Sequence, residues 1–395
     1  MYSESKWALG SAPYATAALA GLIWTLGCSS DSGGKSGDDT NCSGASCAGS
    51  PSTGGSSGSG GSTSTGGSSG SSGSTGVGCP GADGKALPSG EVLYEIPGDI
   101  ADIDRAGDQL YYVSIPSFMG GPGTGGVFRA PAAGGGTFQE VVAYDDYQIS
   151  NLSMLKDSFF GDTGLEGIYQ FSLDGSLIGD RSAAGDHSRS DGEAVYAWFD
   201  DSICADSVKF GLNRVDADGT ITSIDAQAHC IQDVAVGGDY VYWLQGDHYG
   251  DIDPSLTKIA LYRAPKAGGG SRETLPLTVS TWASLEWTDG YVVGQTLADF
   301  ARGRPDDDAP TFIGHGVSEL SGDGAGTAFF SDGSDTYGCL VHVQGSGDVV
   351  RDASFDPVTS RVNLIAAYPD YVYFTVDANE ENGLDRTTIL HRLAR

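Results

Sequence analysis

The chain has 395 residues, with 21 Lys and Arg against 52 Asp and Glu, which gives a formal net charge of −31. A surface this acidic repels phosphate backbones and anionic lipid headgroups, which argues against nucleic-acid binding and against electrostatic adsorption on membranes. Residues 29–78 contain no large apolar side chain except Val77. About 315 residues therefore remain for a folded body, a length typical of a repeat architecture rather than of a single-core sandwich.

The N-terminus has the pattern of an export signal. Lys6 precedes an apolar run at residues 15–26, which is short for a bilayer-spanning helix, and Gly27 and Cys28 follow it. These residues resemble a bacterial lipoprotein signal, although Thr25 stands where that family usually has leucine. The resemblance implies lipidation of Cys28 and location in the cell envelope as an outer-membrane lipoprotein, periplasmic or surface-exposed. An ordinary secretory signal is the alternative.

The segment after the signal predicts a tether. Residues 29–78 cannot bury enough apolar surface to offset the entropy of ordering them, so we expect a disordered Gly/Ser-rich linker. The domain boundaries predicted are therefore 1–28 for the signal, 29–78 for the tether and 79–395 for the folded domain.

Six further cysteines form an even set in an oxidising compartment, so we expect disulfides. Cys204 and Cys230 lie in or beside one repeat and are the favoured pair. Cys42–Cys47 in the tether and Cys79–Cys339 by elimination complete one of the fifteen pairings that six cysteines allow.

Internal repetition is the strongest signal in the body of the chain. A short aromatic and β-branched run follows a turn residue seven times, starting at residues 108, 157, 193, 239, 290, 327 and 370. The mean step of about 44 residues is the period of a four-stranded propeller blade. A second run follows each of six copies and usually ends in a Gly-Gly or Asp-Gly turn, as in Gly126–Gly136 and Ala260–Gly270. Runs rich in small residues precede five copies and suit an inner rim.

These patterns predict an all-β fold, a β-propeller of four-stranded blades. The count favours seven blades; six or eight are alternatives because the fifth repeat shows no clear third strand between Leu297 and Ile313. The last repeat ends without an outer strand, and the surplus strand Glu91–Ile96 can complete that blade and close the ring. The aromatic runs, Tyr240–Trp243 above all, resemble YWTD-like and related bacterial propeller repeats over residues 91–395, which implies a fold and no catalytic motif.

The connections between second and third strands are long in several repeats, and in a propeller they all lie on one face. We expect the ligand-binding residues on that face, since a rigid scaffold presents adaptable loops. These connections cover residues 114–125, 199–210, 245–259, 297–310 and 376–386. The candidate binding face in these loops is acidic and aromatic, and its residues are Asp200, Asp201, Asp247, His248, Tyr249, Asp251 and Asp253.

The predicted function is a monomeric, envelope-anchored, non-catalytic binding or scaffold module for a protein, peptide or glycan ligand, attached to the membrane by its lipid alone. The alternative is a propeller enzyme of hydrolase or lyase type acting on extracellular glycan or peptide. An enzyme needs acids or histidines converging on the axis, and His187, His229 and His315 are the histidines near inner-strand starts. No metal-ligand spacing occurs, so no metal site or cofactor is predicted; calcium binding by residues 216–219, which resemble the start of a calcium loop, is the alternative to a hairpin turn there.

Overall fold

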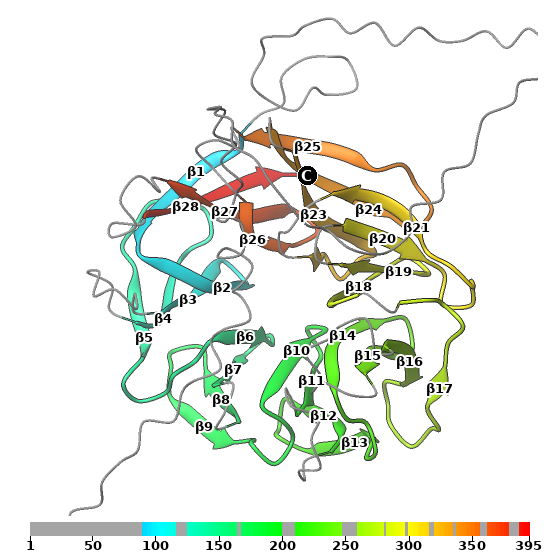
Figure 1. Ribbon diagram of the computed structural model, residues 1–395. Helices are drawn as coiled ribbons and strands as arrows, with labels where there is room; N and C mark the ends of the chain where they lie inside the picture. Colours follow the sequence, from blue (N-terminus) through cyan, green and yellow to red (C-terminus); the bar gives the residue numbers. More distant parts are fainter. Residues whose placement is uncertain are drawn as a thin grey trace, which may run out of the picture. The chain divides into compact units, whose positions relative to one another are not determined.

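The computed structural model describes residues 89–115, 125–163, 167–199, 210–246, 259–279, 282–296, 299–315, 320–334, 337–355, 362–378 and 387–395. All the regular secondary structure in these ranges is β-strand, and the strands form seven four-stranded antiparallel sheets. The sheets follow one another around a centre in chain order (Figure 1). Each inner strand contacts the inner strands of both neighbouring sheets, so the sheets are the blades of a closed seven-bladed propeller.

Each of the first six blades is a meander of four consecutive strands running outward from the centre. Blade 1 comprises β2 (Asp99–Ala106), β3 (Gln109–Ile115), β4 (Gly126–Pro131) and β5 (Gln139–Ala143). Blade 2 comprises β6 (Asn151–Met154), β7 (Ser158–Asp162), β8 (Ile168–Ser172) and β9 (Leu177–Asp180). Blade 3 comprises β10 (His187–Ser190), β11 (Ala194–Trp198), β12 (Leu212–Asp216) and β13 (Ile221–Asp225).

The second half of the ring repeats this order. Blade 4 comprises β14 (Ile231–Gly237), β15 (Tyr240–Gly246), β16 (Ile259–Pro265) and β17 (Glu273–Thr274). Blade 5 comprises β18 (Ser284–Thr288), β19 (Tyr291–Gln295), β20 (Asp299–Gly303) and β21 (Thr311–His315). Blade 6 comprises β22 (Ser321–Gly322), β23 (Thr327–Ser334), β24 (Tyr337–Gln344) and β25 (Val350–Phe355).

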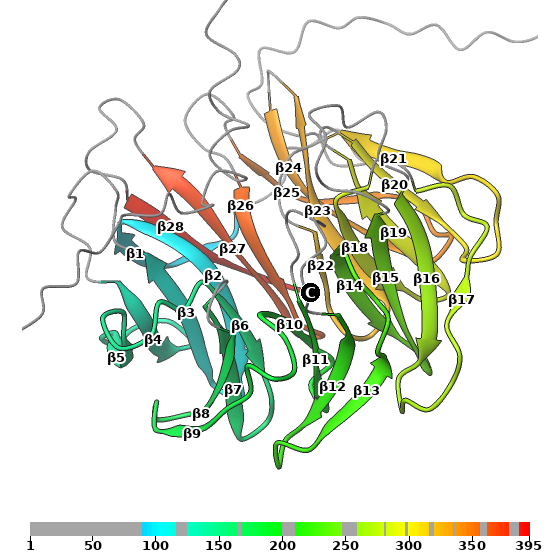
Figure 2. The ribbon, with the colours of Figure 1, turned by 60° about the horizontal axis from the view of Figure 1, so that its bottom comes forward.

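Blade 7 closes the ring as the sequence predicts. Its inner three strands are β26 (Val362–Ala367), β27 (Tyr371–Ala378) and β28 (Thr387–Ala394), and its outer strand is β1 (Glu91–Pro97) from the other end of the domain. β1 pairs antiparallel with β28, and the four strands lie side by side in both views (Figures 1 and 2). The pairing covers the edge that β28 would otherwise leave open.

The aromatic runs that define the repeat form the second strands, and they pack between blades. Tyr196 and Trp198 of β11 share one hydrophobic cluster with Val241 and Trp243 of β15. Strand β11 is buried at every position, because neighbouring blades cover both of its faces. β-branched and aromatic side chains suit such strands, since they fill the wedge between two twisted sheets.

The prediction for the fifth repeat is wrong in detail. The stretch expected to be a long loop, residues 297–310, holds the third strand β20, and the outer strand β21 follows it, so the blade count is seven. The run from Asp299 to Gly303 gives a weak strand signal because only Phe300 and Ala301 in it are apolar, and of these two only Phe300 is buried. Asp306, Asp307 and Asp308 are consequently exposed in a hairpin between β20 and β21, at the opposite end of the blade from the second-to-third connections.

The Asp-Gly turns between third and fourth strands allow close contact between blades. Gly175, in the turn of blade 2, has φ +88°, and a Cβ there would lie 1.9 Å from the carbonyl oxygen of Val141 in blade 1. Only glycine fits both the left-handed conformation and the close approach. The turn therefore fixes the distance between the two blades as well as reversing the chain.

A recurring side chain links each third strand to the next blade's turn. At one repeat position, usually Arg, the side chain donates to a carbonyl of the following hairpin or pairs with an acid in it. We call these contacts the outer ties: Arg129 to Leu173 O (3.2 Å), Gln170 to Ala217 O (2.8 Å), Arg214 to Lys266 O (3.5 Å), Arg263 to Asp306 (3.9 Å), Arg302 to Gly345 O (2.7 Å) and Arg392 to Ala132 O (3.1 Å).

Blade 6 breaks this pattern for a topological reason. Its residue at the repeat position, His342, bonds Asp352 of the same blade at 2.6 Å. Blade 7 has no hairpin after its third strand, because its fourth strand is β1. Arg395 spans the interface from the other side instead, with hydrogen bonds to Asp323 and to Thr327 of blade 6.

Candidate functional site

The candidate site is the central channel, whose wall is made by the inner strands. It encloses a cavity of about 840 Å³, lined by residues of all seven blades. Most of the lining side chains are polar, because the apolar side chains of the repeat face the spaces between blades. The ionisable side chains in the lining include Asp102, Asp104, Asp233, Glu286, Arg189 and His187.

Five carboxylates tie a blade to the next one at four of the seven blade interfaces, and we call these contacts the inner ties. In each, a carboxylate accepts the main-chain N–H of a residue in the following blade, which satisfies a donor that would otherwise be left on an inner edge. The pairs are Asp102 with Leu152 (2.6 Å), Asp104 with Met154 (3.1 Å), Asp162 with Ser188 (2.8 Å), Asp233 with Leu285 (2.7 Å) and Glu286 with Gly322.

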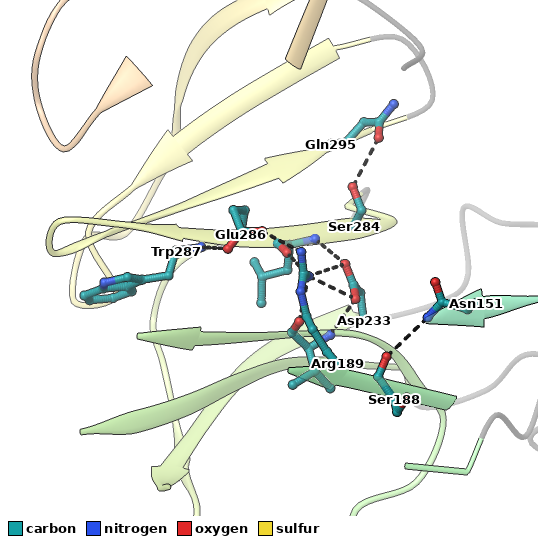
Figure 3. A network of polar contacts seen from close by, with 10 residues as sticks. Asn151, Ser188, Arg189, Asp233, Ser284, Glu286, Trp287 and Gln295 are labelled. Atoms are coloured by element: carbon teal, nitrogen blue, oxygen red, sulfur yellow. Dashed lines mark hydrogen bonds and ion pairs between the residues drawn. The ribbon is translucent and has the colours of Figure 1, made fainter. Parts of the chain in front are cut away.

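Arg189, from β10, gathers two of these carboxylates at one point of the wall (Figure 3). Its Nη2 lies 2.5 Å from Glu286 Oε2, and its Nη1 lies 3.5 Å from both carboxylate oxygens of Asp233. The same Nη1 donates to the carbonyls of Val234 (2.8 Å) and Leu285 (2.7 Å). One guanidinium from blade 3 therefore links blades 4 and 5, using the fixed fork of donors that Arg offers.

Burial dominates the charge state of this wall. The pKa of Asp233 and the pKa of Glu286 are both raised by desolvation, although Arg189 and main-chain donors act to lower them. The pKa of Asp162, which accepts from Ser188 and Asn151, is raised to about 6 by burial. Raised carboxyl pKa values often mark functional sites, but inter-blade ties produce the same shift.

The wall at blades 1 and 7 has a second polar cluster. The hydroxyl of Tyr368 donates to Asp104, and burial raises the pKa of both groups. Arg105 forms two hydrogen bonds with Asp370, of 2.8 and 3.0 Å, and its guanidinium lies 5.0 Å from the centre of the Tyr368 ring. These contacts join the last blade of the ring to the first.

The predicted binding face lies outside the described residues. This holds for all seven of its members, Asp200, Asp201, Asp247, His248, Tyr249, Asp251 and Asp253, and also for the lipidation site Cys28 and the tether. Each predicted disulfide pair likewise includes a cysteine outside the described ranges, so Cys204–Cys230, Cys79–Cys339 and Cys42–Cys47 stay predictions. Cys230 and Cys339 themselves are buried in blades 4 and 6.

Of the three histidines expected near the axis, only His187 lines the channel. Its ring stacks on Trp198 with centroids 5.8 Å apart. His229 bonds the carbonyl of Gln227, and His315 lies at the end of outer strand β21, where it bonds Asp299 at 2.6 Å. The sequence therefore placed one of these three side chains correctly.

In the described ranges, no group of three or more His, Cys, Asp or Glu side chains is arranged so that it could hold a metal ion. Residues 216–219 form the hairpin turn between β12 and β13, in which Gly219 N donates to Asp216 O. Asp218 accepts from Thr220 N at 2.9 Å, as turn residues commonly do. Within the same ranges, no helix is long and apolar enough to cross a membrane.

No protein-family model and no curated protein sequence matches the chain. Among solved structures, similar folds include PorZ, a surface component of the type-IX secretion system of Porphyromonas gingivalis (10% identity, TM-score 0.47, 81% of this chain and 39% of PorZ covered). The computationally designed protein Ika8 has 11% identity and a TM-score of 0.46, with 77% and 100% covered. BamB of Moraxella catarrhalis has 9% identity and a TM-score of 0.40, with 80% and 96% covered. The chain thus spans about two fifths of PorZ, and similarities this weak carry no information on activity or ligand.

Proposed function

We propose that the chain is an envelope-anchored binding or scaffold module without catalytic activity, whose second-to-third strand connections form the binding face. The observation that carries this proposal is the state of the channel wall. Asp102, Asp104, Asp233 and Glu286 each accept a main-chain N–H from the next blade, so they act as ties between blades. A rigid ring that uses its central acids in this way is suited to presenting loops.

The export signal and tether support an envelope location. A lipid on Cys28 would hold the domain at a membrane, and residues 29–78 would let it reach a partner some distance from the surface. The acidic and aromatic loop residues, such as Asp247 and Tyr249, favour a protein, peptide or glycan ligand over nucleic acid.

Capture from an envelope extract tests the binding face. The protein is compared with a variant in which residues 200–209 and 247–258 are replaced by short Gly-Ser turns. The matched control shortens the Asp306–Asp308 hairpin, which lies at the opposite end of blade 5. Loss of a captured partner in the loop variant and its retention in the hairpin control are expected. Equal capture by all three proteins would contradict the assignment of the face.

Fractionation tests the anchor. Cys28→Ala should release the protein from the membrane fraction, whereas Cys47→Ala, a change in the tether, should leave it there. Continued membrane retention of Cys28→Ala would overturn lipid anchoring and leave the binding role to be judged by capture alone.

The alternative, a hydrolase or lyase acting in the channel, is favoured by one observation. Asp233 and Glu286 both have raised pKa values and converge on Arg189 beside a cavity. Paired carboxyl groups of this kind can act as acid and base on glycans. Glycan and peptide turnover by the wild type that disappears in Glu286→Gln, with the fold retained, would favour the enzyme over the binding module.

A further inference from the structure

Strand β1 joins the N-terminal part of the chain to the ring, and its first residues are held firmly. The chain enters it through Gly90, where φ is +78° and a Cβ would lie 3.0 Å from the Phe374 ring and 3.1 Å from the carbonyl oxygen of Arg392. Glu91 pairs with Arg392, and its Oε2 accepts two hydrogen bonds from that guanidinium, of 2.6 and 3.2 Å. Any pull on the tether therefore reaches the ring at a fixed point of blade 7.

The rest of β1 contacts two blades at once. Its backbone pairs with β28 of blade 7, while Tyr94 and Ile96, only 7% and 2% exposed, pack in one hydrophobic cluster with blade 1. The hydroxyl of Tyr94 donates to the carbonyl of Pro131 at 2.7 Å. Beyond the far end of β1, Thr388 Oγ1 donates to the carbonyl of Gly98 at 2.8 Å. The strand is therefore held along its whole length.

The register of β1 shows which end of the blade receives the tether. Glu91 pairs with Arg392, near the end of β28, and Pro97 pairs with Thr387, at its beginning. Thr387 also pairs with Ala378, so the connection between the second and third strands of blade 7 leaves from the Pro97 end. The tether consequently enters at the end of the blade opposite the proposed binding face.

This arrangement decides how β1 would resist a load. A pull between the tether and the second-to-third strand connections acts along the axis of β1 and pushes it to slide past β28. Antiparallel hydrogen bonds lie perpendicular to the strands, so all six residue pairs between β1 and β28 carry such a load together. A pull that draws Glu91 sideways from Arg392 would instead open the pairs one at a time. The same contacts should thus resist the axial pull severalfold better.

We propose that β1 is a load-bearing strap, which keeps the ring closed while a membrane anchor on the tether and a partner on the loop face pull in opposite directions. The source of the load rests on the proposed function, since it requires both the anchor and the binding face. The strap itself depends only on the register and contacts of β1, so it can be tested without lipid or partner.

Single-molecule force measurements on the full chain test the strap. One handle is inserted in the tether after Gly60, and the other either after Asn382, in the blade 7 connection, or at Arg395. The first pair of handles pulls along β1, whereas the second draws Glu91 and Arg392 apart at one end. Because forced unfolding follows the unfolding rate, we expect a severalfold higher rupture force with the Asn382 handle.

The outcomes separate the strap from the proposed function. Equal rupture forces with the two handle positions would overturn the strap. A clear difference in force, together with loss of membrane retention or of partner capture in the experiments above, would leave the strap in place and contradict the proposed function alone.

A matched pair of Tyr-to-Phe variants tests whether rupture begins at β1. Tyr111, in β3, also donates from a buried ring to a carbonyl at the next blade's hairpin, that of Leu173 at 2.9 Å. Tyr94→Phe and Tyr111→Phe should therefore cost similar stability in denaturant. Only Tyr94→Phe should lower the rupture force with the Asn382 handle. Equal rupture forces for the two variants would mean that the ring fails elsewhere and would overturn the proposal.

Discussion

At four blade interfaces, 1–2, 2–3, 4–5 and 5–6, an inner and an outer tie join the same pair of blades with opposite chemistry. The inner ties place carboxylates where little water reaches: Asp162 is 0% exposed and Glu286 8% exposed. The outer ties place Arg side chains, such as Arg129 and Arg302, over hairpin carbonyls at a solvated rim. Removing half of an inner tie leaves a buried polar group without a partner, whereas water replaces an outer one. An inner tie should therefore contribute severalfold more to the free energy of unfolding than an outer tie.

Arg189→Met should produce the largest effect and tests the inner end of this comparison. It leaves Asp233 and Glu286 facing each other without the guanidinium, and breaking a buried ion pair from one side costs about 3–5 kcal/mol. The free energy of unfolding is measured by denaturant titration at neutral pH. Adding Asp233→Asn and Glu286→Gln to Arg189→Met should restore part of the loss. A loss below about 1 kcal/mol would mean that the network is effectively solvated.

Asp162 should make stability depend on pH. Burial raises its pKa from 3.8 to about 6 in the folded state, so its ionised form is disfavoured there. The contribution of this group to stability is complete below about pH 4 and is lost as pH rises through 6. The loss corresponds to about 3 kcal/mol by linkage.

Asp162→Asn checks this sign. Unfolding free energies are compared at several pH values from 4 to 7, and the wild type should fall with rising pH relative to the variant, which cannot ionise at residue 162. Asp180→Asn is the control, because the pKa of exposed Asp180 is lowered by hydrogen bonds from Ser182 and its titration has the opposite sign. Parallel profiles for wild type and Asp162→Asn would contradict a buried, ionising carboxyl at this interface.

Asp102 tests an inner tie in which one carboxylate accepts two main-chain N–H groups. Asp102→Ala leaves the N–H groups of Ile103 and Leu152 without their acceptor, which should cost about 2–3 kcal/mol in the free energy of unfolding. Asp102→Asn keeps one oxygen and should lose about half as much. Equal losses for the two variants would show that charge, rather than hydrogen bonding, gives the tie its value.

Much of the fold could be predicted from the sequence because each repeat contains a recognisable run of aromatic and β-branched residues. The seven aromatic runs fall on the seven second strands, and the surplus run at residues 91–96 is the closing strand β1. Both signals depend on burial, because a buried strand has an apolar pattern that can be recognised in its own sequence without knowing which strands contact it. The weak third strand β20 was missed because its apolar content is low.

The channel was harder to predict because its wall is made by contacts between residues that are far apart in the sequence. Arg189 and Glu286 are 97 residues apart, and nothing in either local sequence indicates that they meet. Strand β10, His-Ser-Arg-Ser, carries no apolar residue, so it gave no strand signal. Asp102 and Asp233, by contrast, share an Ile-x-Asp pattern before a β-branched residue, and alignment of the repeats could have identified both as ties.

Arg302→Gln should have the smallest effect and defines the outer end of the comparison. Arg302 donates to the carbonyls of Gly345 at 2.7 Å and Gly347 at 2.6 Å. Gln170, the equivalent residue of blade 2, reaches the carbonyl of Ala217 with one amide, so the substitution retains one of these bonds. The expected loss is about 0.5–1 kcal/mol, because water can bind the released carbonyl. A loss as large as that of Asp102→Ala, measured by the same denaturant titration, would show that the rim is as dry as the channel wall and that the two sets of ties hold the ring equally.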